Sequence, residues 1–385
     1  MKNARLKSVL AIAAVICLMV PGMLSFTFGQ ETERQAETES DGVTSEYNIS
    51  GPYAYKNLSV FLIHAKGGNG TAKFMTLEEA LKQKKATVIE TGSVNKLVVE
   101  NVSDDVYIYI QAGDIVRGGK QDRTLGNDYV IAPKSGKTPI SSFCVESGRW
   151  RKRGSEGVDK FSVSSNVLPT KGLKIAANYS QSQSSVWKEV AVVQDKLSNN
   201  LGRSVRSGES SSSLELTLDN TEVKKAVQEY VDALWHIVDK KKDVVGFAYA
   251  INGKVESADI YSSSELFMKL WTKLLEAGSV EAIAEIRQDE EYAAPAARSV
   301  NAFLEIEGDV KVSEKQIDEK LKVITRQSKD KIVFETYQAG REQAIHKSYL
   351  SINPELLKQQ KEQMRNLQIQ GETSATSYLQ QQIQR

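Results

Sequence analysis

A series of short β-prone runs, separated by turn residues, constrains the fold of this 385-residue chain most strongly. The first run, Leu58–Ile63, is continuously apolar and is typical of a buried strand. Further runs follow at residues 86–90, 96–101, 106–111, 129–132 and 140–145. Gly, Asp, Asn, Ser or Pro separates them. Strands this close together leave little room for crossover helices, so they predict antiparallel pairing.

Helical periodicity dominates the middle of the chain. A capped, amphipathic helix is predicted after Asp219 or Asn220, with an apolar stripe at i, i+3, i+4 and i+7. The stripe comprises Val223, Val227, Tyr230, Val231, Leu234, Trp235 and Val238. Other predicted helices include a short one capped by the Thr76–Glu79 capping box, one around residues 186–193, and two at 264–277 and 280–286. The sequence therefore predicts an α+β fold: an antiparallel β core, of which a sandwich is one form, with packed amphipathic helices.

Strand patterns return in the second half of the chain. Residues 243–251 and 254–261 flank Asn252-Gly253, which favours a tight hairpin turn. Further strands are predicted at 301–306, 332–338 and 342–351. We interpret residues 47–353 as one composite α+β domain, interrupted by a Ser-rich loop at 203–213.

The two ends of the chain differ in character from this domain. Residues 1–29 combine a basic start, an apolar run and small residues before Gln30, which is the pattern of a secretory signal peptide. An uncleaved membrane anchor is the alternative, although the run is short for a span and contains Pro21. Residues 30–46 are predicted to be a flexible leader, and residues 354–385 a Gln-rich polar helix or tail. We expect an exported protein, periplasmic or extracellular, with no membrane span after signal cleavage.

Composition excludes several classes of function. The net charge of +1 provides no overall field for nucleic acid. The chain has three histidines and lacks the HExxH, CxxC and GxSxG motifs, so no metal site is predicted and the cofactor is unknown. His236 is expected at the polar surface of its helix. Cys144 is the one cysteine left after signal removal, and it is interpreted either as a core residue or as a reactive thiol.

Residues 113–123 are the first part of a chemically unusual stretch. A glycine pair lets backbone amides approach a ligand, and basic side chains next to such amides suit an anion. The candidate ligand-binding residues here are Arg117, Gly118, Gly119, Lys120 and Arg123, while Asp114, Gln121 and Asp122 are candidates for acid–base chemistry or for positioning water. A tight turn with its charges in water is the alternative interpretation.

Residues 144–150 close the same stretch. Glu146 is a further candidate for acid–base catalysis, and Arg149 for binding an anion. Trp150 is expected either to stack on a ring or to cover the core. Glu146 has a structural alternative, in which it orients Arg149 or Arg123 by a bidentate pair. We expect the side chains of Asp122, Arg123, Glu146 and Arg149 to converge on one pocket.

Four segments in order resemble a known domain family. GDIVRGGKQDR, CVESGRW, VWKEVA and VVGFAYAINGKVESADIYSSSELF are similar to the family named for its association with ADP-ribosylglycohydrolase and rhodanese-phosphatase proteins, over about Tyr53–Ser351. The family name reflects neighbouring genes and fused domains. The resemblance therefore implies only a loose link to ADP-ribose or NAD processing.

Three function hypotheses follow. The first is a binding module for an anionic, nucleotide-like or ADP-ribose-like small molecule at the two segments above. The second is a hydrolase that uses a carboxylate as general acid or base in the same pocket. The third is a structural envelope protein that binds a protein partner through residues 355–385.

Overall fold

The computed structural model describes residues 46–66, 73–149, 154, 157, 159–287 and 290–353. The predicted signal peptide, all but the last residue of the leader, and the C-terminal tail lie outside the described residues. The remaining chain forms the single compact unit that contains the predicted composite domain. No helix in these described ranges is long and apolar enough to cross a membrane.

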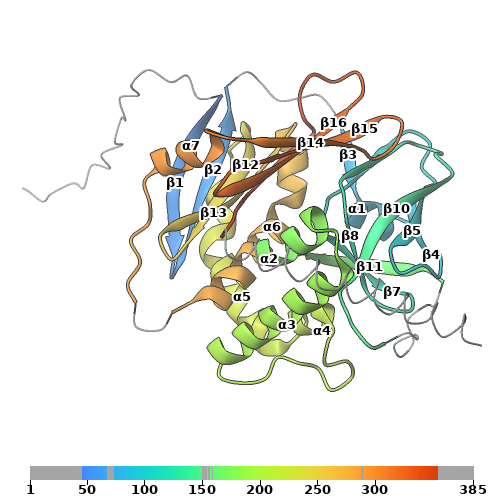
Figure 1. Cartoon of the computed structure of the whole chain (residues 1–385), viewed down its shortest axis with the longest axis horizontal. Coiled ribbons are helices and arrows are strands. Elements are labelled where there is room, and N and C mark those ends of the chain that lie inside the picture. The colour runs from blue at the N-terminus through green and yellow to red at the C-terminus, as the bar shows by residue number, and fades with distance from the viewer. Residues whose placement is uncertain are drawn as a thin grey trace, which may run out of the picture. The chain divides into compact units, whose positions relative to one another are not determined.

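Antiparallel sheets form the centre of the structure (Figure 1). The largest has eight strands in the order β1-β2-β12-β13-β17-β16-β15-β14. These strands are β1 (Tyr47–Tyr55), β2 (Leu58–Ala65), β12 (Val244–Ile251), β13 (Lys254–Tyr261), β14 (Lys311–Gln316), β15 (Leu321–Gln327), β16 (Lys331–Gln338) and β17 (His346–Ser351). Strands from both ends of the described sequence thus meet in one sheet.

Two smaller sheets are built from the region between β2 and the first long helix. One has six strands in the order β11-β7-β8-β10-β5-β4, and the other has three in the order β3-β6-β9. Their strands are β3 (Phe74–Thr76), β4 (Ala86–Glu90), β5 (Lys96–Asn101), β6 (Tyr107–Ile110), β7 (Asp114–Gly118), β8 (Arg123–Leu125), β9 (Tyr129–Ile131), β10 (Lys137–Cys144) and β11 (Phe161–Val167). The β3–β6 pair is parallel and the other named strand pairs are antiparallel.

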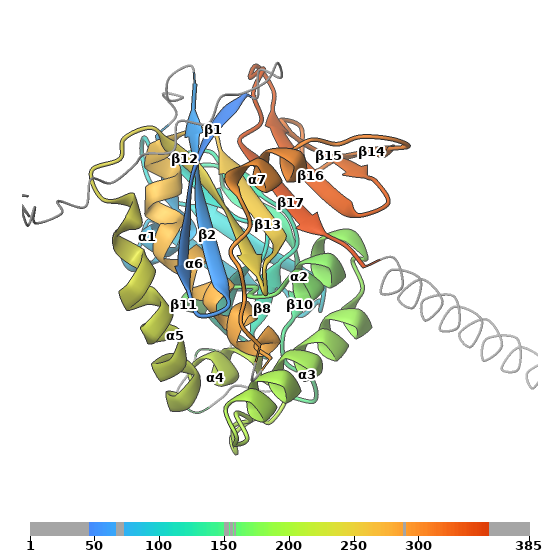
Figure 2. The ribbon, with the colours of Figure 1, turned by 90° about the vertical axis from the view of Figure 1, so that its left-hand side faces the viewer.

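Helices cover both faces of the eight-stranded sheet (Figure 2). The longest, α6 (Ser264–Glu285), packs on β12, whereas α7 (Ala297–Leu304) packs on β1 and β13. The others are α1 (Leu77–Lys82), α2 (Lys171–Lys174), a π-helical turn η1 (Ile175–Tyr179), α3 (Gln183–Asn200), α4 (Leu214–Leu218), α5 (Thr221–Leu234) and a 3₁₀ turn η2 (Trp235–Val238).

Strand β2 shows why its sequence is apolar without alternation. Leu58, Val60 and Leu62 belong to the main core, which includes residues of α5 and α6. Phe61 and Ile63 belong to a second apolar cluster, against which residues of α7 pack. Because both faces of the strand are covered, both sets of side chains are buried. The predicted antiparallel α+β fold is confirmed.

Several predicted elements agree with the structure. Thr76 and Glu79 form the reciprocal capping box of α1, and Asn220 caps α5. The Asn252-Gly253 turn connects β12 to β13, and Asn252 has a φ of +53°. His236 is exposed, as expected.

Three predictions were wrong in detail. Residues 301–306 were expected to form a strand, but residues up to Leu304 form α7, because Val300, Phe303 and Leu304 follow helical spacing and pack on one apolar cluster. Trp235 was placed in the core stripe, but α5 ends at Leu234 and the following 3₁₀ turn leaves the Trp235 side chain half exposed. The two helices predicted between 264 and 286 are one, α6.

Candidate functional site

Three of the predicted residues, from the two parts of the unusual stretch, meet in a buried ion cluster. We call it the Arg149 cluster (Asp122, Glu146 and Arg149). The guanidinium of Arg149 contacts Glu146 Oε2 at 2.7 Å and 2.8 Å, and it lies 3.6 Å from Asp122 Oδ1. Asp122 also accepts a hydrogen bond from the Gly118 amide at 2.9 Å. The Gln121 side chain donates to the Glu146 carbonyl. The structural alternative for Glu146, holding Arg149, is the arrangement found here.

Arg123 lies beside this cluster but has a different charged partner. Its side chain is fully buried, donates to the Gln121 carbonyl at 2.9 Å and pairs with Glu90 at 3.3 Å. Asp122 and Glu146 are also fully buried. Side chains this deeply buried contact a ligand only if the surrounding structure opens.

The other predicted residues of the first segment point to separate partners. Asp114 forms an ion pair with Lys273 of α6, and Arg117 pairs with Asp219 at 2.6 Å. Gly118 and Gly119 have φ values of +119° and +58° in the turn between β7 and β8. The Lys120 amide is 3.5 Å from Glu90 Oε2. The predicted residues of the first segment therefore do not share one site. Asp114 and Arg117 each pair with a different residue, and both lie apart from the Arg149 cluster in their charged contacts.

Cys144 and Trp150 complete the predicted set. Cys144 is fully buried in β10, and burial raises the pKa of its thiol to about 11. Its backbone N–H and carbonyl both bond the Gln183 side chain. These features are those of a core residue. Trp150 lies outside the described residues.

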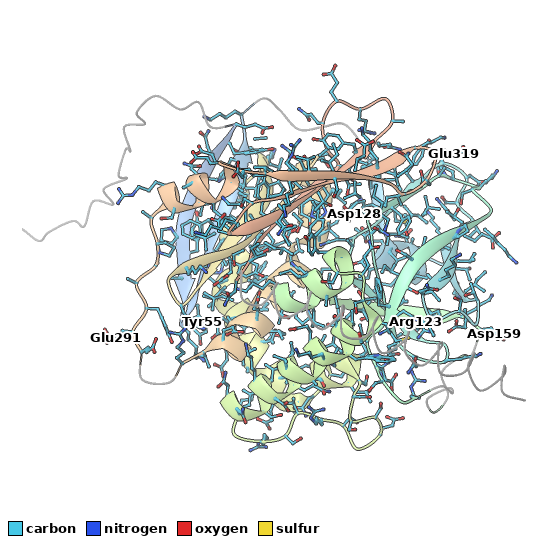
Figure 3. The ribbon with its side chains drawn as sticks, viewed as in Figure 1. Tyr55, Arg123, Asp128, Asp159, Glu291 and Glu319 are labelled. Carbon is cyan, nitrogen blue, oxygen red and sulfur yellow. The ribbon has the colours of Figure 1, made fainter. Side chains whose placement is uncertain are left out.

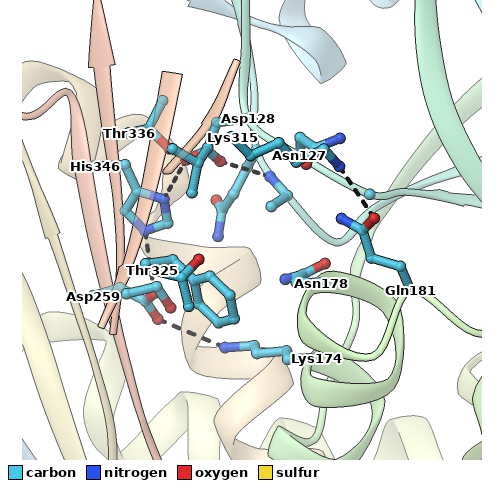
Figure 4. A pocket seen from close by; sticks show the side chains of 16 residues that line it. Asn127, Asp128, Lys174, Asn178, Gln181, Asp259, Lys315, Thr325, Thr336 and His346 are labelled. Atoms are coloured by element: carbon cyan, nitrogen blue, oxygen red, sulfur yellow. Dashed lines mark hydrogen bonds and ion pairs between the residues drawn. The ribbon is translucent and has the colours of Figure 1, made fainter. Parts of the chain in front are cut away.

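A second cluster, which was not predicted from the sequence, lines a recess at the face of the eight-stranded sheet (Figure 4). We call it the Asp259 recess. The space around its lining, counted out through the open mouth into solvent, is about 590 Å³. Figure 3 labels Arg123 and Asp128, one from each region, and shows them at separate places.

Cross-strand register builds the floor of the recess. One row of directly opposed residues runs Asp259, Ser348, Phe334 and Thr325 across β13, β17, β16 and β15. The next row on the same face contains His346, Thr336, Val323 and Lys315. The residues that alternate with them, including Ile260, Val333 and Tyr349, are in the apolar cluster on the opposite face. The period of two thus places the polar residues together.

Helix α2 and the π-helical turn form the opposing wall. Lys174 ends α2, and Asn178 lies in η1, a π-helical geometry that occurs often at functional sites. Gln181 follows with a φ of +47°. The connection between β8 and β9 adds Asn127 and Asp128. Four separate parts of the fold therefore contribute to one recess.

His346 bridges the two aspartates of the recess. Its Nδ1 lies 2.9 Å from Asp128 Oδ2, and its Nε2 lies 3.1 Å from Asp259 Oδ1. Burial alone would lower the pKa of His346, but Asp128 and Asp259 outweigh burial and raise it to about 9. The imidazole is therefore protonated at neutral pH, and both nitrogens donate.

The two carboxylates differ in how well they are satisfied. Asp128 accepts hydrogen bonds from the Ala112 amide and the hydroxyls of Thr336 and Tyr109, in addition to His346. Asp259 Oδ2 has an ion pair with Lys174 Nζ at 3.6 Å but no hydrogen-bond partner among the described residues. Burial would raise the pKa of both carboxyls, yet His346, and Lys174 for Asp259, hold both below the usual value.

Two other acceptors in the recess also lack partners. They are Gln111 Oε1 and Asn178 Oδ1, neither of which accepts a hydrogen bond in the described part of the chain. Buried polar atoms in folded proteins are normally satisfied, so unsatisfied ones point to water or to a ligand. Across the described ranges, no group of three or more His, Cys, Asp and Glu side chains could hold a metal ion.

The fold and the recess define an α+β protein with a polar recess on the face of its largest sheet. The model of the ARG and Rhodanese-Phosphatase-superfamily-associated Protein domain matches residues 46–350, and the chain belongs to this family. The match confirms the resemblance stated from the four sequence segments. No curated protein and no solved structure matches the chain.

Proposed function

We propose that this protein is a binding module for a small anionic ligand, and that the ligand occupies the Asp259 recess. The observation that carries the proposal is Lys174. Its side chain is only about 7% exposed, and the single polar contact of its Nζ among the described residues is the 3.6 Å ion pair with Asp259. An ammonium with unused donors at the wall of a cavity favours an acceptor-rich ligand.

Charge in the recess supports the same conclusion. Protonated His346, Lys174 and Lys315 face Asp128 and Asp259, which leaves one positive charge in excess. Lys315 lies at the mouth, where its ammonium donates to Gln181 Oε1 at 3.1 Å. The excess charge favours an anion over a cation.

The Asp259 recess supports the anionic ligand better than the Arg149 cluster does. In the cluster, each carboxylate already faces a guanidinium, and Asp122 and Glu146 are fully buried. In the recess, polar atoms without partners line a cavity with a mouth. Nucleotide-like and ADP-ribose-like compounds remain the ligand classes proposed from the sequence.

Binding is favoured over the hydrolase alternative for an electrostatic reason. A general base works best when its pKa lies near the working pH. The pKa values of Asp128 and Asp259 are both below the usual value, so these carboxylates are weak bases. The envelope role through residues 355–385 and the exported location stay predictions, because both depend on segments outside the described residues.

A thermal-shift screen of the full chain tests the proposal, with nucleotides, sugar phosphates, sugar acids and inorganic phosphate as probes. We expect at least one probe to raise Tm, and Lys315→Ala to weaken its binding at least tenfold because a cation at the mouth is lost. Lys311→Ala is the matched control: it removes the same charge from the same strand, but Lys311 does not line the recess.

Three outcomes would contradict the proposal. The first is the absence of any stabilising probe. The second is equal binding by Lys315→Ala and wild type. The third is loss of binding in Lys120→Ala but not in Lys315→Ala, which would move the ligand to the Gly118-Gly119 turn.

A further inference from the structure

We infer that the ligand of the Asp259 recess is an anionic polyol, whose hydroxyl groups occupy the deep end of the recess and whose anionic group lies at the mouth. This inference rests on the proposed function and specifies its ligand class. The argument depends on which atoms lack partners, on the charges beside them, and on where the cations lie.

Beside the Lys174 ammonium, three acceptors at the deep end lack hydrogen-bond partners among the described residues. Asp259 Oδ2, Gln111 Oε1 and Asn178 Oδ1 lack donors among the described residues, and the Asp259 and Gln111 side chains are almost completely buried. A phosphate or carboxylate group alone offers only acceptors at neutral pH, so it cannot satisfy them. A ligand that carries hydrogen-bond donors would satisfy them.

The neighbouring charges exclude ions at this end. A ligand ammonium would meet Lys174 and protonated His346, and a ligand anion would meet the carboxylate of Asp259. A hydroxyl is neutral and both donates and accepts. A hydroxyl placed beside the Asp259–Lys174 pair donates to Oδ2 and accepts from Nζ, and so uses the capacity that both groups retain.

The mouth of the recess carries a cation, in contrast to the unsatisfied acceptors at the deep end. Lys315 contacts the Gln181 side chain there, and Asn127 adds a further polar group (Figure 4). Lys315 lies on the edge strand β14, whereas Asp259 lies on β13 in the interior of the sheet, with β15, β16 and β17 between them. Phe334 provides an apolar surface on the floor for the carbon skeleton.

Isothermal titration of the full chain with four probes tests the inference. Ribose 5-phosphate carries hydroxyls and a phosphate, n-pentyl phosphate carries only the phosphate, ribonate replaces the phosphate with a carboxylate, and ribitol lacks charge. We expect ribose 5-phosphate to bind at least tenfold more tightly than n-pentyl phosphate, because the latter leaves the acceptors unsatisfied. Ribitol should bind more weakly than ribose 5-phosphate. Comparing the affinities of ribose 5-phosphate and ribonate shows whether the mouth of the recess prefers a phosphate or a carboxylate.

A substitution at the deep end sharpens the test. Gln111→Met keeps the length of the side chain and removes its unsatisfied acceptor, together with the interaction of its amide with the Tyr261 hydroxyl. The unliganded protein should therefore keep most of its stability. We expect this variant to bind ribose 5-phosphate at least fivefold more weakly and n-pentyl phosphate unchanged. If Gln111→Met does not fold, Asn178→Ala provides the same comparison at the second acceptor.

The outcomes separate this inference from the proposed function. Equal affinities for ribose 5-phosphate and n-pentyl phosphate, both reduced by Lys315→Ala, would overturn the polyol inference and keep the anion site. The polyol inference would also be overturned if Gln111→Met reduced the affinities for ribose 5-phosphate and n-pentyl phosphate by the same factor. Failure of every charged probe to bind would contradict the proposed function itself.

Discussion

The ring of Tyr261 lies parallel to the ring of His346, with centroids 4.6 Å apart and an interplanar angle of 5°. The two residues are directly opposed on β13 and β17. An aromatic face stabilises a cation stacked on it, so Tyr261 adds to the effect of Asp128 and Asp259 in favouring protonated His346. Protonated His346 thus links Asp128, Asp259 and Tyr261 at the floor of the recess, and it loses its proton only above neutral pH.

We expect the stability of the protein to fall as pH rises through about 9. The folded pKa of His346, about 9, exceeds its ordinary value of 6.5, so its contribution is complete below pH 6.5 and is lost as pH rises through the folded pKa. The shift corresponds to about 3 kcal/mol. Chemical denaturation between pH 6 and 10 measures it.

Two histidine variants isolate the contribution of His346. His346→Gln should be less stable at pH 6 and should lose less stability between pH 6.5 and 9 than wild type does. His236→Gln is the control, because His236 is exposed on η2. Identical pH profiles for wild type and His346→Gln would show that His346 is not the titrating group.

The Arg149 cluster should contribute strongly to stability. Arg149→Leu leaves the buried Glu146 carboxylate without its cation, and removing one partner of a buried pair costs about 3–5 kcal/mol. Arg203→Leu breaks the exposed pair with Glu222 and should cost less than about 1 kcal/mol. Urea denaturation compares the two variants, and similar losses would contradict a structural role for the cluster.

Gly119 should tolerate alanine poorly. A Cβ at this position, where φ is +58°, would lie 2.5 Å from Cζ of the buried Phe161 ring. Gly136→Ala is a matched control, since its φ is +67° and no atom lies within 4 Å of its Cβ position. We expect both to lose about 1 kcal/mol from the positive φ, and Gly119→Ala to lose about 1–3 kcal/mol more. Thermal denaturation would refute this if the two variants had equal Tm.

Cys144 should be unreactive in the folded protein. With a pKa of about 11, roughly one thiol in a thousand is ionised at pH 8, and the side chain is fully buried. We expect no reaction with a thiol reagent at pH 8 within the time that denatured protein takes to react completely. Rapid labelling of native protein would instead support the reactive-thiol interpretation.

Elements determined by neighbouring residues, such as helix caps and tight turns, were predicted from the sequence more accurately than elements determined by distant contacts. The capping box at Thr76 and the Asn252-Gly253 turn depend on neighbouring residues, so they could be identified directly. Strand β1, the β14–β15 hairpin and α7 were missed because their patterns are weak or mixed. Burial of β14 is slight, and its sequence KVSEKQ has no apolar face that predicts a strand.

The recess was missed because it depends on long-range register. Asp128, Asp259 and His346 are far apart in the sequence, and only the order of the strands brings them together. One sequence pattern could have indicated the recess: Asp259 lies between the apolar residues Ala258 and Ile260 in a predicted strand, so its side chain points to the opposite face of the sheet from theirs. In contrast, Glu146 and Arg149 are three residues apart, so their pairing could be predicted.

The residues of the recess belong to strands of very different exposure. Asp259 and His346 lie on strands β13 and β17 in the interior of the sheet, whereas Lys315 is on β14, an edge strand whose residues are all exposed. Replacements at position 315 leave the packing of the interior intact. The selectivity of the entrance can therefore be redesigned, or diverge among relatives, without a penalty in folding, while the floor is restricted by its role in the core.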